Sequence, residues 1–257
     1  MEDRKHYGAI DGLRTIAAIG IVMMHMGANN TYAISDFVYD RIIPSFKDFV
    51  FLFMVLSSFG MCCGYYKKIL NNQILISDFY KKRWQKAFPF FALLVVVDLI
   101  ASPSIESLYE GFVDVTLMFG LLPNTMDISV IGVGWFLGLI FVFYLCFPFF
   151  CFLLENKRRA WFSFGISLIY NFICSKYIAA DRSNILYSAC YFIAGGLIYL
   201  YRDEIRILNR WIVLAITCIL VAVYYVFGGN TFTWLSISVL LLSYAVLALG
   251  GYWKTSL

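Results

Sequence analysis

Long apolar segments recur along this chain, and they limit its possible folds more than any other feature. A helix needs about 20 mostly apolar residues to cross a bilayer. Eight segments reach or approach that length: 9–27, 48–66, 87–102, 132–154, 161–176, 185–201, 211–227 and 232–252. Of the 257 residues, 61% are hydrophobic and 14% are charged, whereas a soluble domain has about 25% charged residues. We therefore predict an all-α, polytopic transmembrane helix bundle with about eight spans.

Several of these segments are short for a span and would need the Tyr and Trp residues at their ends to reach the membrane interfaces. A ninth apolar run, 112–122, is too short to cross, so we predict a re-entrant or interfacial piece between the third and fourth spans. We detect no linker or internal repeat, which favours a single membrane-embedded domain over residues 1–257.

The positions of Lys and Arg predict the orientation. If the N-terminus is cytoplasmic, the outer loops hold four of the 20 Lys and Arg residues, namely Arg41, Lys47, Lys176 and Arg182. Arg14 lies within the first span, and the cytoplasmic segments hold the other fifteen. An excess of this kind marks cytoplasmic loops. It predicts an even number of spans with both termini in the cytoplasm.

Two function classes find no support. The chain has neither a basic domain nor a recognition motif for nucleic acid, so we expect no nucleic-acid partner. Its seven cysteines lie scattered through apolar segments, and none has metal-ligand spacing beside a histidine. We therefore expect no metal and interpret the cysteines as small buried side chains.

The first span carries three ionisable residues, Asp11, Arg14 and His25. Arg14 and His25 are eleven residues apart, which in a helix is about 20° beyond three full turns and about 16 Å along the axis. Asp11 falls near the same stripe. Charged groups facing lipid cost a few kcal/mol each, so this stripe should face a bundle interior or a wet cavity.

Structural roles are also compatible with these residues. Asp11 and Arg14 lie near the cytoplasmic boundary, where an ion pair at i,i+3 would anchor the helix. A lone membrane histidine can serve as a hydrogen-bonding residue between helices. The alignment of His25 with Arg14 favours a functional polar path.

The stretch IDGLRTIAAIGIVMMH resembles the opening motif of the membrane acyltransferase-3 family, D-x-L-R followed after ten residues by His. Four later stretches resemble further family segments in the same order. FLFMVLSSFGM (51–61) has Ser58 where Gly is usual, and FYKKRWQKAFPFF (79–91) has Lys86 where a second Arg is usual. GWFLGLIFVFYLCFPFF (134–150) matches at Trp135, Leu137, Tyr144 and Pro148, and YFIAGGLIYLYR (191–202) fits the Gly-containing span that follows.

The resemblance implies an O-acyltransferase that moves an acyl group, often acetyl, from cytoplasmic acyl-CoA to a hydroxyl of an envelope glycan or glycolipid. It implies the bacterial cytoplasmic membrane as location. Family members usually have two more spans, so the last pair is expected to be missing. Two alternatives follow: a non-catalytic truncated remnant, and a transporter of lipid-linked saccharides.

The family chemistry needs a base for the acceptor hydroxyl, and histidine is the side chain most often used. We expect His25 to take that proton, or to carry the acyl group transiently, with Arg14 and Asp11 beside it. The cytoplasmic loop 67–86 holds six Lys or Arg residues, of which Arg83 and Lys86 are our candidates for the acyl-CoA phosphates, with Arg14 deeper. Positive-inside topology alone also explains a basic loop here.

Four further residues are candidates for substrate contact. Ser57 and Ser58 lie in the middle of the second span, where serine more often permits close helix packing. Trp135 is more typical of the aromatic belt or of packing. Asp98, in the third span, is a candidate for orienting His25.

Overall fold

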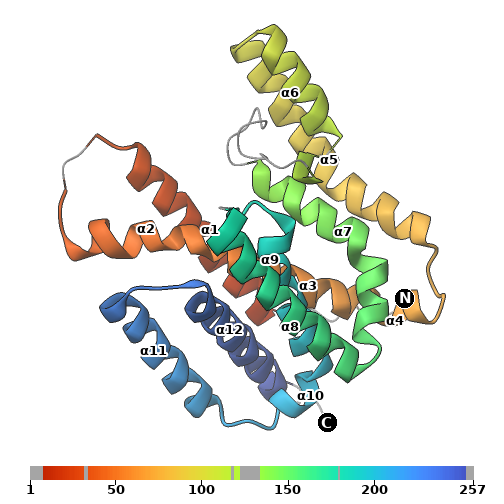
Figure 1. The fold of residues 1–257 in the computed structure, drawn as a ribbon, viewed down its shortest axis with the longest axis vertical. Coiled ribbons are helices and arrows are strands. Elements are labelled where there is room, and N and C mark those ends of the chain that lie inside the picture. Colours follow the sequence, from red (N-terminus) through yellow and green to blue (C-terminus); the bar gives the residue numbers. More distant parts are fainter. Residues whose placement is uncertain (1–7, 32–33, 117–118, 122–133, 179, 253–257) are drawn as a thin grey trace. The chain divides into compact units, whose positions relative to one another are not determined.

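The computed structural model describes residues 8–31, 34–116, 119–121, 134–178 and 180–252 (Figure 1). Helices provide all the regular secondary structure in these ranges. Arg4, Lys5 and Lys254, which entered the charge count, lie outside them. Residues 132–133 of the predicted 132–154 span and residues 117–118 and 122 of the 112–122 run also fall outside the described residues.

Helices occupy all eight segments predicted from hydropathy. The first is α1, Gly8–Asn29. The second is one helical stretch, Val38–Leu70, made of η1 Val38–Ile42, α2 Ile43–Ser45, η2 Phe46–Asp48, α3 Phe49–Met61, η3 Cys62–Tyr66 and α4 Lys67–Leu70. Then follow α5 Ile76–Ala101, α6 Ile105–Val115, η4 Phe119–Leu121, α7 Trp135–Leu154, α8 Lys157–Ile173, η5 Cys174–Ile178, α9 Ile185–Leu200, α10 Arg202–Ile205, α11 Arg210–Phe227 and α12 Thr231–Tyr252.

Within the described residues, six helical stretches are long and apolar enough to cross a membrane: α1, Val38–Leu70, α5, α7, α11 and α12. The helices α8 and α9 are shorter, with 17 and 16 residues. The prediction of an all-α polytopic membrane fold is confirmed. The number eight and the cytoplasmic location of both termini stay predictions.

The basic segment before the third span is not the loop that we predicted. After α4, the chain turns over residues 71–75 and is helical again from Ile76, with Pro89 inside α5. Proline removes one helical hydrogen bond but, in membrane helices, neighbouring groups compensate for the loss. As a consequence Arg83 and Lys86 stand three residues apart on a helix, a spacing that puts them on neighbouring positions of one face.

The helix α6 folds back along the C-terminal end of α5. A Cβ at Gly111 would lie 3.1 Å from the side chain of Leu99 and 3.2 Å from that of Val95, so the two helices are in close contact there. The opposite face of α6 is apolar and exposed at Ile105, Leu108, Tyr109 and Phe112. The re-entrant or interfacial piece predicted over 112–122 overlaps α6 only at residues 112–115, and it stays a prediction.

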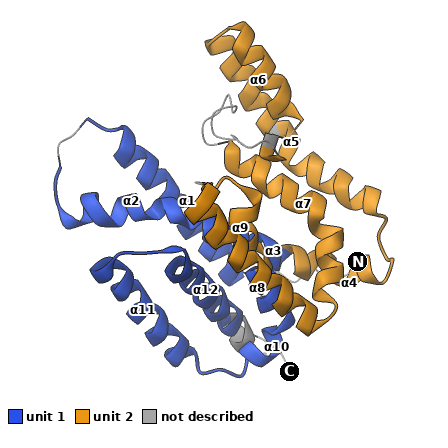
Figure 2. Cartoon of the chain, in the orientation of Figure 1, with its two compact units in different colours: residues 1–60, 194–257 blue, residues 61–193 orange. Residues whose placement is uncertain are grey.

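The chain divides into two compact units (Figure 2). Unit 1 comprises Met1–Gly60 and Ala194–Leu257, and unit 2 comprises Met61–Ile193. In unit 1, α1 packs against α12 and against α2 and η2, and α11 pairs with α12. In unit 2, α5 contacts α6 and α7, and α7 contacts α4, α8 and η4.

Aromatic side chains fill the core of unit 2. Phe79 of α5, fully buried, stacks on Phe147 of α7 with ring centroids 5.6 Å apart. A second cluster contains Phe91, Val95 and Phe141, which are all buried. Dispersion between such closely packed rings holds helices together where the surrounding lipid is equally apolar.

Candidate functional site

The helix α1 has one exposed apolar face and one face turned into unit 1. The exposed side chains are large and apolar, namely Ile16, Ile19, Val22, Met23 and Met26. Ala17 and Gly20 are buried on the other side, where Arg14 and His25 are half-buried. The two polar residues thus lie on the side of the helix that faces the protein, as the spacing of eleven residues predicts.

Arg14 joins α1 to α3. Its Nη1 donates to Oδ1 of Asp11 at 3.1 Å, the predicted i,i+3 pair, and its Nη2 lies 3.5 Å from the carbonyl oxygen of Leu56. A Cβ at Gly60 would lie 2.8 Å from that Nη2. The guanidinium therefore rests on the backbone of α3 at a position where a side chain would displace it.

His25 lies in the part of α1 that sits closest to α2 and η2. Its carbonyl oxygen accepts a hydrogen bond from Nδ2 of Asn29 at 2.8 Å, and its side chain is half-buried. On either side of it, Gly20 packs directly against the ring of Phe49, and a Cβ at Gly27 would lie 3.1 Å from the side chain of Ile43. Two glycines at which α1 contacts the side chains of Phe49 and Ile43 thus stand before and after the histidine.

Ser57 and Ser58 occupy different environments on α3. Ser57 is half-buried, whereas Ser58 is fully buried and its Oγ has no hydrogen-bond partner among the described residues. A Cβ at Gly195 of α9 would clash with the carbonyl of Val55 and would lie 2.8 Å from the Cβ of Ser58. The contact of Ser58 with Gly195 fits a packing role for this serine.

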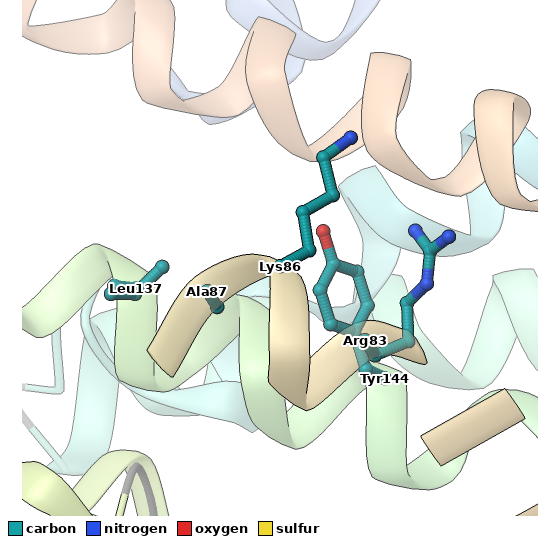
Figure 3. Close-up of a pocket in the computed structure, with 5 residues that line it drawn as sticks. All are labelled: Arg83, Lys86, Ala87, Leu137 and Tyr144. Atoms are coloured by element: carbon teal, nitrogen blue, oxygen red, sulfur yellow. The ribbon is translucent and has the colours of Figure 1, made fainter. Parts of the chain in front are cut away.

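In unit 2, Arg83 and Lys86 line a small hollow between α5 and α7 (Figure 3). Its volume is about 210 Å³, and Ala87, Leu137 and Tyr144 complete the lining. Arg83, Lys86 and the Tyr144 hydroxyl point to the same side in Figure 3, while Ala87 and Leu137 form the apolar end. The hollow is therefore cationic on one side and apolar on the other.

Two tyrosines hold the guanidinium of Arg83. Its Nη2 donates to the hydroxyl oxygen of Tyr65 at 2.7 Å, and its Cζ lies 4.7 Å from the centroid of the Tyr65 ring. The ring of Tyr144 lies 5.7 Å from the same carbon. The sequence indicated Tyr65 only as an interfacial aromatic residue at the end of the second span. Its contact with Arg83 was not predicted, because the two residues are 18 apart and Tyr65 belongs to no stretch matched to the family.

The remaining candidate residues lie in different environments. Trp135 is buried, with the guanidinium carbon of Arg182 5.5 Å from its ring centroid. Asp98 is half-buried near the C-terminal end of α5. A carboxylate that the sequence analysis passed over, Asp114 of α6, is fully buried. Among the described residues, no three or more His, Cys, Asp or Glu side chains gather closely enough to hold a metal ion.

The comparisons with known proteins place the chain in a family. The acyltransferase 3 profile, described as an acyltransferase domain, matches residues 7–257, which is nearly the whole chain. No curated protein and no solved structure gives a significant match. The match includes α1 with Asp11, Arg14 and His25 and the stretch with Arg83 and Lys86. This chain, an integral multi-pass membrane protein, belongs to the acyltransferase 3 family.

Proposed function

We propose that this protein transfers an acyl group, acetyl in the simplest case, from a cytoplasmic acyl-CoA to a hydroxyl of an envelope polysaccharide or glycolipid in a bacterial cytoplasmic membrane. The family supports acyl transfer in general. One structural observation supports the assignment of the reacting groups: Arg14 and His25 are both half-buried on the same side of α1. A cation and a proton acceptor on one protein-facing stripe are the two groups that acyl transfer from an anionic donor needs.

In the proposed reaction, His25 accepts the proton of the acceptor hydroxyl as its oxygen attacks the thioester carbonyl. The new O–C bond forms, the C–S bond breaks, and the thiolate of CoA leaves and takes up the proton. Such a base contributes about 10²- to 10⁴-fold to the rate. In a variant of the scheme, His25 first carries the acyl group itself.

The donor is held by its phosphates in this proposal. Arg83 and Lys86 bind phosphate at the hollow of unit 2, where guanidinium offers paired donors and ammonium a point charge. Arg14 of unit 1 is a further candidate cation for the donor, and Asp11 fixes its position through the 3.1 Å contact. The lining of the hollow by two cations supports the assignment.

The test uses the full chain in proteoliposomes with radiolabelled acetyl-CoA and envelope glycolipid extracted from the expression host. We expect His25→Ala to lower acetyl transfer by about 100-fold or more, at equal protein per vesicle. His6→Ala changes the other histidine of the chain and is the matched control, expected at the wild-type rate.

The second variant in this experiment is Arg14→Ala. Its matched control is Arg41→Ala, which changes an exposed arginine of η1. We expect Arg14→Ala to lose most of the transfer and Arg41→Ala to lose none. Full transfer in both His25→Ala and Arg14→Ala would refute the proposal. Movement of labelled glycolipid across the vesicle membrane without acetyl-CoA would favour a transporter instead.

A further inference from the structure

The guanidinium of Arg83 is held by a tyrosine and has no acidic partner among the described residues. Within the described residues no carboxylate lies in ion-pair distance of it, and its buried Nε has no hydrogen-bond partner. Its one hydrogen bond there goes to a neutral phenol, the hydroxyl of Tyr65. In the part of the chain that the structure describes, the charge of Arg83 is therefore available for a charge-assisted hydrogen bond to an anion.

Tyr65 is itself held rigidly. Its ring packs edge-on against Phe79, with centroids 5.1 Å apart and an interplanar angle of 74°. Phe79 is fully buried and stacks on Phe147 of α7. The phenol that receives the Arg83 hydrogen bond is thus anchored in the aromatic core of unit 2.

The backbone around Tyr65 departs from a regular α-helix. Residues Cys62–Tyr66 form a π-helical turn, η3, between α3 and α4. One extra residue in a turn rotates the side chains that follow by about 100°, and such turns occur often at functional sites. Tyr65 lies within this π-turn, and its hydroxyl accepts the hydrogen bond from Arg83.

We propose that Tyr65 is a positioning residue for the acyl donor. Its hydroxyl and ring hold the Arg83 guanidinium at the hollow, so a donor phosphate binds a cation that is already oriented. A long arginine side chain that is ordered before binding loses less conformational freedom when the anion arrives. This inference rests on the proposed function, because it takes Arg83 as a ligand of the acyl-CoA phosphates.

The decisive variant is Tyr65→Phe, which keeps the ring and removes the hydroxyl. We expect the KM for acetyl-CoA to rise about three- to tenfold with kcat within twofold, the pattern for a group that binds substrate and transition state equally. The KM for the glycolipid acceptor should not change. Tyr65→Leu, which also removes the ring contact, should raise the donor KM further.

Tyr80→Phe is the matched control. Tyr80 lies one turn before Arg83 on α5, and its hydroxyl donates to the carbonyl oxygen of Leu145 at 2.7 Å. The variant therefore loses one hydrogen bond of the same length in the same unit without touching Arg83. We expect its donor KM to equal that of the wild type. An equal rise in Tyr80→Phe and Tyr65→Phe would overturn the inference.

Equilibrium binding of CoA alone to the full chain gives a readout independent of turnover, and a double-mutant cycle makes it specific. If Tyr65 acts through Arg83, Tyr65→Phe weakens CoA binding in the wild type but has little further effect in Arg83→Lys. Additive losses, or unchanged CoA binding in Tyr65→Phe, would contradict the proposal. If the wild-type chain itself bound no CoA, the proposed function would fail rather than the role of Tyr65.

Discussion

The contacts of Arg14 give one glycine a function that its sequence context does not reveal. Gly60 stands on α3 next to the guanidinium, four residues after Leu56, whose carbonyl oxygen lies 3.5 Å from Nη2. Any side chain at this position has to share space with the cation. Because the end of an arginine side chain moves easily, a side chain at this position would shift the guanidinium of Arg14 without unfolding the protein.

We expect Gly60→Ala to lower acyl transfer several-fold while the thermal unfolding temperature stays within a few degrees of the wild type. The matched control is Gly12→Ala on α1, because a Cβ at Gly12 has no neighbour within 4 Å. Transfer assays and thermal unfolding of the purified variants check both expectations. A Gly60→Ala protein with the full wild-type rate would show that the guanidinium position does not matter.

At the residue scale, local spacing was enough to predict some contacts and not others. The Asp11–Arg14 pair follows from a separation of three residues in a helix. The Arg14–Leu56 contact spans 42 residues and the Arg83–Tyr65 bond spans 18. Contacts between helices depend on how those helices pack, and one sequence does not contain that information.

At the element scale, α3 and α9 approach each other closely at a glycine. A Cβ on Gly195 would overlap the carbonyl of Val55 and press on Ser58. Small residues at such crossings let backbones come into contact, and in membranes this packing is a main source of helix association. A side chain at Gly195 would meet the backbone of Val55, which cannot move aside as the end of the Arg14 side chain can at Gly60.

We therefore expect Gly195→Ala to destabilise the protein by about 1–3 kcal/mol. Gly165→Ala on α8, where a Cβ would meet nothing within 4 Å, is the control and should not lower stability. Reversible unfolding in detergent measures the difference. Equal unfolding free energies for the two variants would contradict the close contact between α3 and α9.

The borders of α5 show why element ends were harder to predict than element positions. The apolar segment 87–102 and the charged residues before it predicted that the third helix begins near residue 87, yet α5 begins at Ile76. Hydropathy detects the part of a helix that lies in lipid, and a membrane helix can continue into water where its residues are polar. The basic residues of this stretch are therefore helical.

At the scale of the whole molecule, unit 1 combines the two ends of the chain. The helix α1 packs against α12, and α12 buries Trp234, Leu242, Ala245 and Val246. Neither end of the chain alone provides both partners of this contact. The stability of the first helices should therefore depend on the last one.

Deleting residues 231–257 removes α12 and should reduce the yield of monodisperse protein in detergent several-fold relative to the wild type. The control chain ends at Tyr252 and keeps α12 whole. Quantitative size-exclusion chromatography compares the two. If the chain without α12 accumulates and elutes like the control, α12 is not needed to hold unit 1 together.

The membrane fold could be predicted because the bilayer imposes length and polarity on every span. The pairing of helices could not, because lipid and protein interior are equally apolar. The most apolar 18-residue segments of α7 and α11 have similar mean hydropathies, 2.6 and 2.1. Yet 56% of the α7 segment is buried, against 11% of the α11 segment. Hydropathy alone does not separate a central helix from one on the lipid side.

The joining of distant segments in unit 1 also has a consequence for biosynthesis. The ribosome completes α1 long before it makes α12, so the earliest helix enters the bilayer without its final neighbour. Contacts between residues so far apart in sequence form slowly and leave surfaces uncovered in the meantime. The nascent chain should therefore depend on an insertase or membrane chaperone until translation ends.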